Sequence, residues 1–494
     1  MKIAFVNDAF EKIGVEYIAA VLKRNGHTVK LFYDPQLFDD ENMSLWPLKK
    51  IFSYRKKIVH DVVSYKPDVV AFSVVSDFYS WASELAFLIK KETQVPIIFG
   101  GIHPTSVPEH VIMDPSVDVV CVGEGEYPFL EFVQNIQKGK IDYSVSNLWF
   151  KVKGKIIKNP IRPLISHLDM LPFPDKDLFF DVSGHFQKTY FVSTGRGCPF
   201  ECSYCYNSFA RRLYEGKGFY VRRRSPGNVI EELALAKKRY KINFIRFNDD
   251  TFTYDIEWIK NFATLYKQHI NLNFSCFAHP NTISEDLLVA LKNAGCCEVE
   301  IGVQTFSEKI RQEVLNRFTS TQQIERAIAL VNNSGMQISV NNMLGIPWQT
   351  EEEIQDLARF YNKNRVGRLY MYGLRYYPRT NITEFAYEKG ILSSRDIERI
   401  EQGEEVLPFT CGGHAQKNKE FGGFMTLFAL LPYLPSRVNE AILKWRLYKI
   451  MPSLPYHILI LFTNWFRIPF KYNWMLRRTI IRYPKFMLEK IFSF

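Results

Sequence analysis

Short apolar strands alternate with amphipathic helices twice along this 494-residue chain, and this alternation constrains the fold more than any other feature. The first series lies in residues 1–139, where the strand-like segments are KIAFVND, TVKLFY, VVAFSVV, PIIFGG and VDVVCVG. Such a pattern is typical of a doubly wound parallel sheet, which binds ligands at the carboxyl ends of its strands. We therefore predict an α/β domain of this kind over the first 139 residues.

The second series occupies residues 186–405 and contains about six strand–helix units, starting with the strand YFVSTG. Eight units would close a complete TIM barrel, so six predict a partial (β/α)6 TIM barrel. Two further regions complete the predicted organisation. Residues 140–185 form a connector with a hairpin turning at Gly154, and residues 406–494 form a helical C-terminal extension.

Three of the chain's eight cysteines lie close together in the loop after the first strand of the second series. Cys198, Cys202 and Cys205 follow the pattern C-x3-C-x2-C in GRGCPFECSYCYN. The N-terminal MKIAFVNDAF lacks the pattern of a signal peptide, so we expect a cytoplasmic protein whose thiols stay reduced and bind metal. A structural zinc ion usually needs four ligands, and ferredoxins supply four thiolates to each [4Fe-4S] cluster. Three thiolates leave one iron of such a cluster open to a small molecule.

This motif resembles the signature of radical S-adenosylmethionine (radical SAM) enzymes, C-x3-C-x-aromatic-C, with Tyr204 at the aromatic position. The resemblance implies that the open iron binds the amino and carboxylate groups of S-adenosyl-L-methionine, which is reductively cleaved to methionine and a 5′-deoxyadenosyl radical. It also implies a set of residues that contact S-adenosylmethionine: Tyr204, Asn248 and Asp249 in FNDD, Gln304 in EIGVQTFS, Arg317 in VLNRFTS, and Asn341 in NNMLGIPWQT.

Structural alternatives remain open for some of these positions. Asp250, next to Asp249, is also a suitable helix cap, and Arg317 is also suited to a surface ion pair. The chain departs from many relatives at His279 in FSCFAHPNTI, where they carry arginine, and we expect this departure to alter the substrate side of the barrel.

The first domain resembles the flavodoxin-like cobalamin-binding domain of cobalamin-dependent radical SAM enzymes. The loops GGIHPT and VGEGE carry this resemblance. Many cobalamin modules place D-x-H-x-x-G after the first strand, but residues 8–14 contain no histidine, and His103 belongs to a loop element beside the corrin. We therefore expect no imidazole ligand from the first loop. The residues implied to cradle cobalamin are Ser73, Ser76, Gly100, Gly101, Thr105, Gly123 and Glu124; in a domain that had lost cobalamin they would be turns only.

The pairing of the two domains implies an enzyme that methylates an unactivated carbon, with a flavodoxin or ferredoxin as reductant. One alternative is a radical oxidative cyclase similar to the anaerobic porphyrin ring cyclase. Another is a non-catalytic iron–sulfur binding or sensing protein. A methylthiotransferase is disfavoured because the first domain has only Cys121 and lacks the ligands of a second cluster. No catalytic residue is assigned beyond the cluster.

The net charge of +11 is concentrated at the C-terminus, where residues 431–494 hold eleven Lys or Arg and two Glu. Since these cations are confined to an aromatic-rich tail, we expect no nucleic-acid partner. No apolar run in the chain reaches the length of a transmembrane helix. The tail suits either a helical cap on the barrel or a peripheral contact with anionic lipid. The second alternative would favour a hydrophobic or lipid-like substrate over another small molecule.

Overall fold

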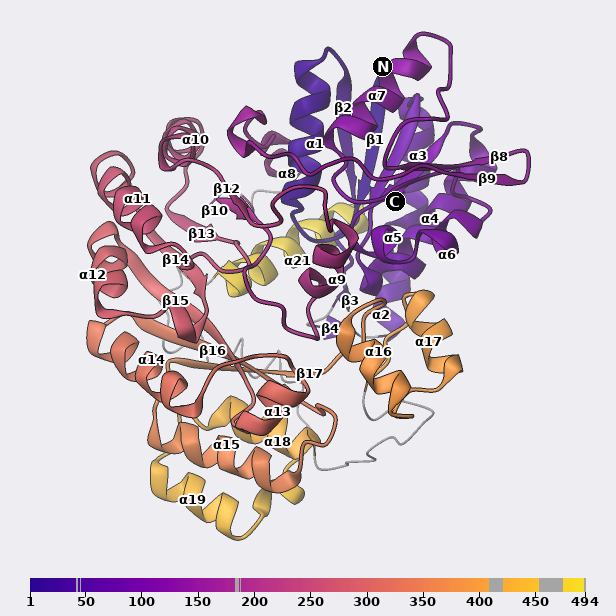
Figure 1. Ribbon diagram of the computed structural model, residues 1–494. Helices are drawn as coiled ribbons and strands as arrows, with labels where there is room; N and C mark the ends of the chain where they lie inside the picture. Colours follow the sequence, from indigo (N-terminus) through magenta and orange to yellow (C-terminus); the bar gives the residue numbers. More distant parts are fainter. Residues whose placement is uncertain are drawn as a thin grey trace.

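The computed structural model describes residues 1–40, 43–44, 46–182, 186, 188–407, 421–452 and 474–492. Two α/β units occupy most of this length (Figure 1). The first is drawn in indigo and purple, and the second, in magenta to orange, is the barrel. This architecture confirms the predicted fold class, with its two parallel sheets and helical C-terminal portion.

The first unit is built on a seven-stranded sheet with the order β2-β1-β5-β6-β7-β8-β9. Its strands are β1 (Lys2–Asn7), β2 (Thr28–Tyr33), β5 (Val69–Ser73), β6 (Ile97–Gly100), β7 (Val119–Cys121), β8 (Leu148–Val152) and β9 (Lys155–Lys158). The first five strands run parallel, as expected for a doubly wound sheet. The predicted hairpin turns at Gly154, but β8 pairs antiparallel with β7. The hairpin of β8 and β9 therefore extends the first sheet, because the backbone of β8 forms hydrogen bonds with the edge strand β7.

The connections of the first unit are mostly helical. They comprise α1 (Ile13–Arg24), α2 (Trp46–Ile51), α3 (Arg55–Tyr65), η1 (Ser76–Phe78), α4 (Tyr79–Glu92), α5 (Ile102–Ser106), α6 (Pro108–Met113), α7 (Glu126–Gln137), and the short strands β3 (Asp39–Asp40) and β4 (Met43–Ser44). The segment that follows the sheet contains η2 (Leu168–Met170) and α8 (Asp177–Phe180).

The second unit contains six parallel strands in the order β10-β13-β14-β15-β16-β17. They are β10 (Thr189–Val192), β13 (Phe244–Phe247), β14 (Asn273–Ala278), β15 (Cys296–Gln304), β16 (Gln337–Leu344) and β17 (Arg368–Gly373). A small ribbon, β11 (Gly195–Arg196) with β12 (Arg222–Arg223), lies beside β10. The sheet stays open between β10 and β17, so the barrel is partial, as predicted.

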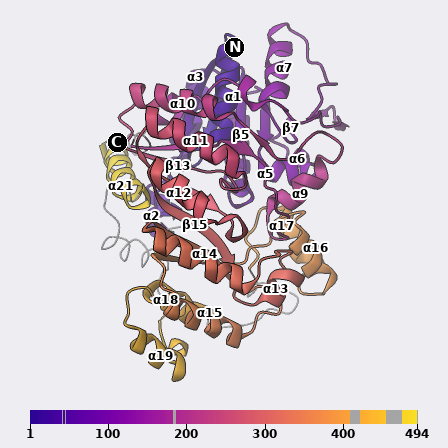
Figure 2. The same ribbon diagram turned by 60° about the vertical axis from the view of Figure 1, so that its left-hand side comes forward.

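Helices cover the outer face of the barrel, as Figure 2 shows for α10 to α15. The helices of the second unit are α9 (Tyr206–Leu213), α10 (Pro226–Arg239), α11 (Ile256–His269), η3 (Pro280–Thr282), α12 (Glu285–Ala294), α13 (Glu308–Glu313), α14 (Thr321–Ser334), α15 (Glu351–Lys363), α16 (Asn381–Glu388) and α17 (Ser394–Glu401). Of these, α9, α16 and α17 lie toward the first unit (Figure 1). Local sequence sets their ends. Ser225, Asp255 and Ser320 cap the N-termini of α10, α11 and α14 with their side chains, and Gly295 ends α12 in a left-handed conformation. The cap of α11 is thus Asp255 and not Asp250.

Buried contacts hold both the connecting segment and the barrel against the first unit. Lys176 lies 2.7 Å from carboxylate oxygens of both Glu11 and Glu16, and the three side chains are almost fully buried. Arg224 of the barrel contacts the Tyr17 hydroxyl at 3.2 Å. Such contacts specify one relative orientation of the units, because a buried charge displaced from its partner is strongly destabilising.

The C-terminal region packs against both units. Helices α18 (Phe421–Leu430) and α19 (Ser436–Lys444), followed by η4 (Leu447–Lys449), lie against β17 and α15. Helix α21 (Trp474–Phe492) packs on the first unit, where the Tyr54 hydroxyl donates to the Phe486 carbonyl at 2.6 Å and the amide of Phe38 donates to Tyr483. No helix within the described ranges is both long and apolar enough to cross a bilayer. Residues 408–420 and 453–473 of the predicted extension lie outside the described residues.

Candidate cofactor sites

The three cysteines lie in the loop between β11 and α9, at the carboxyl end of the barrel. Two glycines permit the close approach of this loop to β12. A Cβ on Gly195 would lie 2.6 Å from the Arg222 carbonyl oxygen, and a Cβ on Gly197, which has φ +82°, would lie 2.5 Å from that of Tyr220. Larger residues would push the loop away from the ribbon. The GRG that precedes the first cysteine is therefore required by packing.

Each of the three thiols has a polar side chain beside it. Thr251 Oγ1 lies 3.4 Å from Cys198 Sγ. Arg317 Nη1 lies 3.3 Å from Cys202 Sγ, and the Asn207 amide lies 3.5 Å from Cys205 Sγ. Hydrogen bonds to cluster ligands tune the stability of the thiolate and the reduction potential of the cluster. The Arg317 side chain is 6% exposed and approaches a cysteine, so it forms no surface ion pair.

The raised pKa values of two of these thiols indicate that the loop is suited to binding a metal centre. Burial raises the pKa of Cys205 to about 12 and also raises the pKa of Cys198. Thiols that would stay protonated alone become thiolates when they bind metal, so this donor set suits a cationic iron centre. Among the described residues, no group of three His, Cys, Asp or Glu converges on a single metal ion. The ligands of a [4Fe-4S] cluster need no such convergence, because each binds a different iron.

Three of the residues predicted to contact S-adenosylmethionine line one cavity of about 500 Å³ at the barrel mouth. They are Tyr204, Gln304 and Asn341. Gln304 has φ +69° at a bulge in β15, an unusual backbone conformation for this residue type. A Cβ at Gly302 would lie 2.5 Å from Gln304 Nε2, so the glycine makes room for this amide. Strain of this kind is often kept at ligand sites.

Asn248 and Asp249, which were predicted to contact S-adenosylmethionine together, lie in different surroundings. Asp249 is buried and accepts hydrogen bonds from the amide and hydroxyl of Thr194, at 2.9 and 2.7 Å. It thereby holds the start of the cluster loop. Asn248 is exposed and lines the cavity of the first unit, not the one at the barrel mouth. Adjacent residues at a strand end point to opposite sides, which accounts for the separation.

His279 lies directly after β14, beside the cluster loop. Its ring stacks on Phe200 of the cluster loop, with centroids 3.6 Å apart and planes 15° apart. Burial, followed by the charge of Arg317, lowers the pKa of His279 to about 2, so the ring is neutral. His279 therefore contacts the cluster loop, and the predicted effect on the substrate side of the barrel stays a prediction.

A buried polar network inside the barrel was missed in the sequence. Glu300 accepts hydrogen bonds from Arg246 at 2.8 Å and from Asn341 at 2.9 Å. Glu298 pairs with Arg368 at 3.3 Å. The available signal was a charge at every second position of the strand EVEI, where the alternate residues, such as Val299, pack in the apolar core. The network anchors Asn341 beside the mouth cavity.

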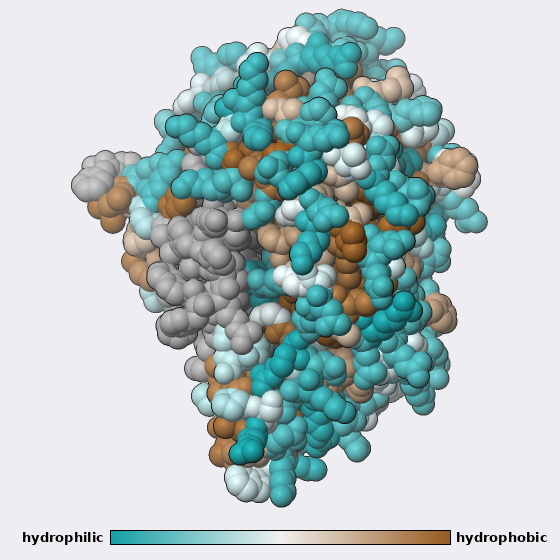
Figure 3. Space-filling view, turned by 90° about the vertical axis from the view of Figure 1, so that its left-hand side faces the viewer, coloured by the Kyte–Doolittle hydropathy of each residue, from teal (hydrophilic) through white to brown (hydrophobic). Residues whose placement is uncertain are grey.

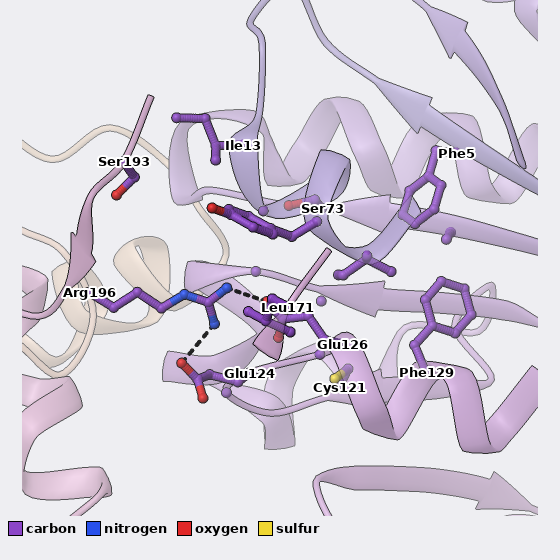
Figure 4. A pocket seen from close by; sticks show the side chains of 18 of the residues that line it. Phe5, Ile13, Ser73, Cys121, Glu124, Glu126, Phe129, Leu171, Ser193 and Arg196 are labelled. Atoms are coloured by element: carbon purple, nitrogen blue, oxygen red, sulfur yellow. Dashed lines mark hydrogen bonds and ion pairs between the residues drawn. The ribbon is translucent and has the colours of Figure 1, made fainter. Parts of the chain in front are cut away.

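The cavity of the first unit has a volume of about 400 Å³ (Figure 4). Phe5 and Phe129 form its apolar end. Residues at the carboxyl ends of β5, β6 and β7 also line it. A Cβ on Gly101, which has φ +101°, would lie 2.8 Å from backbone atoms of Val74. The cavity is thus cradled by backbone that only glycine permits, and this shape fits a flat, mostly apolar group.

Five of the seven residues predicted to cradle cobalamin line this cavity: Ser73, Gly100, Gly101, Gly123 and Glu124. The other two, Ser76 and Thr105, do not line it; their side chains hold neighbouring loops. Ser76 Oγ lies 3.0 Å from Nδ1 of the fully buried His103, and Thr105 Oγ1 accepts from the Gly123 amide. No histidine is among the described residues that line the cavity.

The Glu124 carboxylate joins the two units. Arg196 bridges Glu124 at 2.8 Å and Glu126 at 2.5 Å (Figure 4), and Arg222 lies 2.9 Å from Glu124. Burial alone would raise the pKa of Glu124, but the two arginines lower it below its usual value. Residues Ser193, Gly195 and Asn248 close the cavity from the barrel side. The carboxyl ends of the two sheets therefore face each other.

Comparison with known proteins agrees with this geometry. The B12 binding domain family matches residues 3–133, and the radical SAM superfamily matches residues 192–361. An uncharacterized methyltransferase of Pyrococcus horikoshii is 29% identical over 77% of this chain and 79% of that protein. The anaerobic magnesium-protoporphyrin IX monomethyl ester cyclase of Rubrivivax gelatinosus is 24% identical over 73% of this chain and 66% of that protein.

A solved structure supports the fold over the whole chain. The cobalamin-dependent S-adenosylmethionine radical enzyme OxsB, with aqua-cobalamin and S-adenosylmethionine bound, aligns with a TM-score of 0.67 and 14% identity. The alignment covers 100% of this chain and 80% of that one. At this identity the likeness shows the fold alone.

The fold, the three-thiol loop and the glycine-lined cavity together define an iron–sulfur enzyme with a second cofactor domain. The chain combines a radical SAM domain, residues 192–361, with a B12 binding domain, residues 3–133. Its cofactors are a [4Fe-4S] cluster, S-adenosyl-L-methionine and cobalamin.

Proposed function

We propose that this enzyme methylates an unactivated carbon of a hydrophobic small molecule. When bound, the cluster and S-adenosylmethionine supply a radical that removes a hydrogen atom, and cobalamin supplies a methyl group. The observation that carries the proposal is the opposition of the two sheets. The mouth cavity includes Asp77 of the first unit, paired at 3.1 Å with Arg375 of the barrel. A substrate between the units would therefore meet both cofactor domains.

The chain's own residues have separate tasks in this proposal. Cys198, Cys202 and Cys205 hold the cluster, and Arg317 donates to Cys202. Tyr204, Gln304 and Asn341 bind S-adenosylmethionine in the mouth cavity. Part of the remaining wall of that cavity is apolar, with Met343, Met371, Leu374 and Met425, and another part carries the charged Asp77, Arg375 and Glu405. Methionine side chains adapt to apolar ligands of irregular shape, which supports a hydrophobic substrate.

The product of methyl transfer distinguishes this proposal from its alternatives. Reconstituted protein should be incubated anaerobically with reductant, cobalamin and S-adenosylmethionine labelled in its methyl group. Methylation of cobalamin would leave S-adenosylhomocysteine and labelled methylcobalamin, and radical formation would leave 5′-deoxyadenosine. Formation of 5′-deoxyadenosine without labelled methylcobalamin would favour the oxidative cyclase, a second candidate that the Rubrivivax relative supports. A sensing protein would form neither product. We infer that the electron comes from a flavodoxin or ferredoxin. Activity with either of these proteins in place of the chemical reductant would support this inference.

We also propose that the end of α19 contacts anionic lipid. Trp445 and Ile450 are 67% and 81% exposed, and Lys444 and Arg446 beside them are exposed cations. Figure 3 shows hydrophobic side chains among hydrophilic ones at the lower end of the molecule, where Figure 1 places α19. An aromatic residue flanked by cations suits the headgroup boundary of a membrane.

Sedimentation with vesicles tests this contact. Wild-type protein should sediment with anionic vesicles at low salt and less at high salt. Trp445→Ser with Ile450→Ser should weaken binding, whereas Phe219→Ser, at an 87% exposed position in the barrel, should not. Equal binding by all three proteins would refute a lipid contact at α19.

A further inference from the structure

His279 lies at the edge of the cluster loop, where a ring stack and two backbone hydrogen bonds fix its position. Its ring stacks on the ring of Phe200. Phe200 lies between Cys198 and Cys202 in the sequence. The His279 carbonyl accepts hydrogen bonds from the Thr282 amide and hydroxyl at 2.9 and 2.8 Å. The ring therefore has one orientation, which backbone and packing contacts determine together.

The hydrogen bonds of His279 place its proton. Nδ1 accepts a hydrogen bond from the Asn281 amide at 3.2 Å. A backbone amide only donates, so Nδ1 carries no hydrogen. A neutral imidazole with a bare Nδ1 has its proton on Nε2. His279 therefore presents an N–H donor at the ring edge opposite η3.

This donor is buried and has no partner in the described part of the chain. The His279 side chain is 4% exposed, and no hydrogen-bond acceptor lies within reach of Nε2. Nε of the neighbouring Arg317, whose Nη1 contacts Cys202 Sγ, is likewise buried without an acceptor. Native proteins satisfy nearly all such groups, so two orphan donors beside the thiols indicate an acceptor that the protein itself does not supply.

We propose that His279 is a positioning residue of the cluster site, whose Nε2–H donates a hydrogen bond to an acceptor that arrives with the cofactors. The acceptor is either a sulfur of the cluster or the carboxylate of S-adenosylmethionine, both of which are anionic. The proposal rests on the cofactors assigned above and is independent of the substrate and of methyl transfer.

Three substitutions separate the donor from the structural roles of the ring. His279→Asn retains a side-chain acceptor for the Asn281 amide but removes the Nε2 donor. His279→Phe retains the stack on Phe200 and also removes the donor. His279→Gln restores an amide donor at similar reach. His269→Asn, at an exposed position at the end of α11, is the matched control.

The readouts are the midpoint potential of the cluster, from electron paramagnetic resonance during a redox titration, and the dissociation constant of S-adenosylmethionine. Iron content and circular dichroism first establish that each variant is folded and loaded. If the acceptor is a sulfur, His279→Asn and His279→Phe will lower the midpoint potential without S-adenosylmethionine, because a donor stabilises the more negative reduced cluster. If the acceptor is the carboxylate, the potential stays unchanged and the dissociation constant rises roughly tenfold.

In either case His279→Gln should recover part of the effect, and His269→Asn should show none. Unchanged potential and unchanged affinity in loaded His279→Asn would overturn the proposal. So would a His279→Gln variant as impaired as His279→Phe, because the ring rather than the donor would then be required. Failure of methyl transfer would affect neither readout, so the proposed function and this inference fail separately.

Discussion

The cavities of the two units differ in how their polar groups are satisfied. In the first unit the polar groups that line the cavity are paired within the protein: the Gly123 amide with Thr105, and the Glu124 carboxylate with two arginines. Behind this lining, Nε2 of His103 is buried without a partner in the described residues. Around the barrel mouth, atoms of His279, Arg317 and Asn341 are buried without partners in the described residues. The first cavity is thus shaped by backbone before a ligand enters, whereas the second is completed by what it binds.

Removing the three thiols should have the largest effect, because the barrel site would then lose the ligands of its cluster. Replacing Cys198, Cys202 and Cys205 together by Ala should abolish iron binding and cleavage of S-adenosylmethionine, because no other described group can replace the ligands. Iron content and formation of 5′-deoxyadenosine measure both effects. Cys297→Ala, which removes a free and partly buried thiol elsewhere in the barrel, should retain both. Cleavage by the triple variant would contradict the whole assignment.

Removing the cation between the units should have the next largest effect. Arg196→Met leaves Glu126 buried without its cation and should lower the free energy of unfolding by about 3 kcal/mol. Urea denaturation measures this loss. Arg359→Met removes an exposed pair with Asp356 and should cost less than about 1 kcal/mol. Equal stability of the two variants would show that the ionic contact between the units contributes little.

The same contact predicts a dependence on pH. The pKa of Glu124 is lower in the folded protein than its usual 4.5. A carboxyl with a lowered folded pKa contributes stability that is complete above pH 4.5 and is lost as the pH falls through the folded value. The melting temperature of wild type should therefore fall more steeply below pH 4.5 than that of Glu124→Gln. Parallel curves would contradict the lowered pKa.

A methyl group on Gly101 tests whether backbone shapes the first cavity. Gly101→Ala combines a positive φ with a clash against Val74 and should cost about 2 kcal/mol and weaken cobalamin retention. Absorbance after gel filtration measures retention. Gly139→Ala has a similar φ of +73° but no neighbour within 4 Å, so it isolates the strain from the clash. Full retention by Gly101→Ala would mean that the ligand does not depend on this backbone.

The smallest expected effect concerns the axial ligand of the cobalt in bound cobalamin. Because no described histidine lines the cavity, the electron paramagnetic resonance spectrum of bound cob(II)alamin should lack the nitrogen splitting of an imidazole ligand. His103→Gln should leave that spectrum unchanged, since His103 is not among the residues that line the cavity. Imidazole splitting that disappears in the variant would instead identify His103 as the ligand.

Sequence reasoning predicted the elements better than their contacts. The strand and helix patterns predicted both sheets, because burial imposes a period of two on strands and of about 3.6 on helices. The spacing of Cys198, Cys202 and Cys205 likewise indicated the cluster within one loop. Asn248 and Asp249 were predicted to act together, yet they face opposite sides of a strand end. Local sequence determines that two residues are neighbours, but not which surface each one reaches.

What the sequence by itself determined are therefore the local features: two βα series, the glycines that allow tight approaches, and one loop with three thiols. Tertiary structure alone decided which distant residues meet. Arg196 reaches Glu124 across 72 positions of sequence, and the hairpin after residue 147 joins the first sheet. His279 and Phe200 stack although 79 positions separate them, and this contact places the histidine beside the loop of the three thiols. Such pairings depend on packing of whole layers, whose geometry no short pattern encodes.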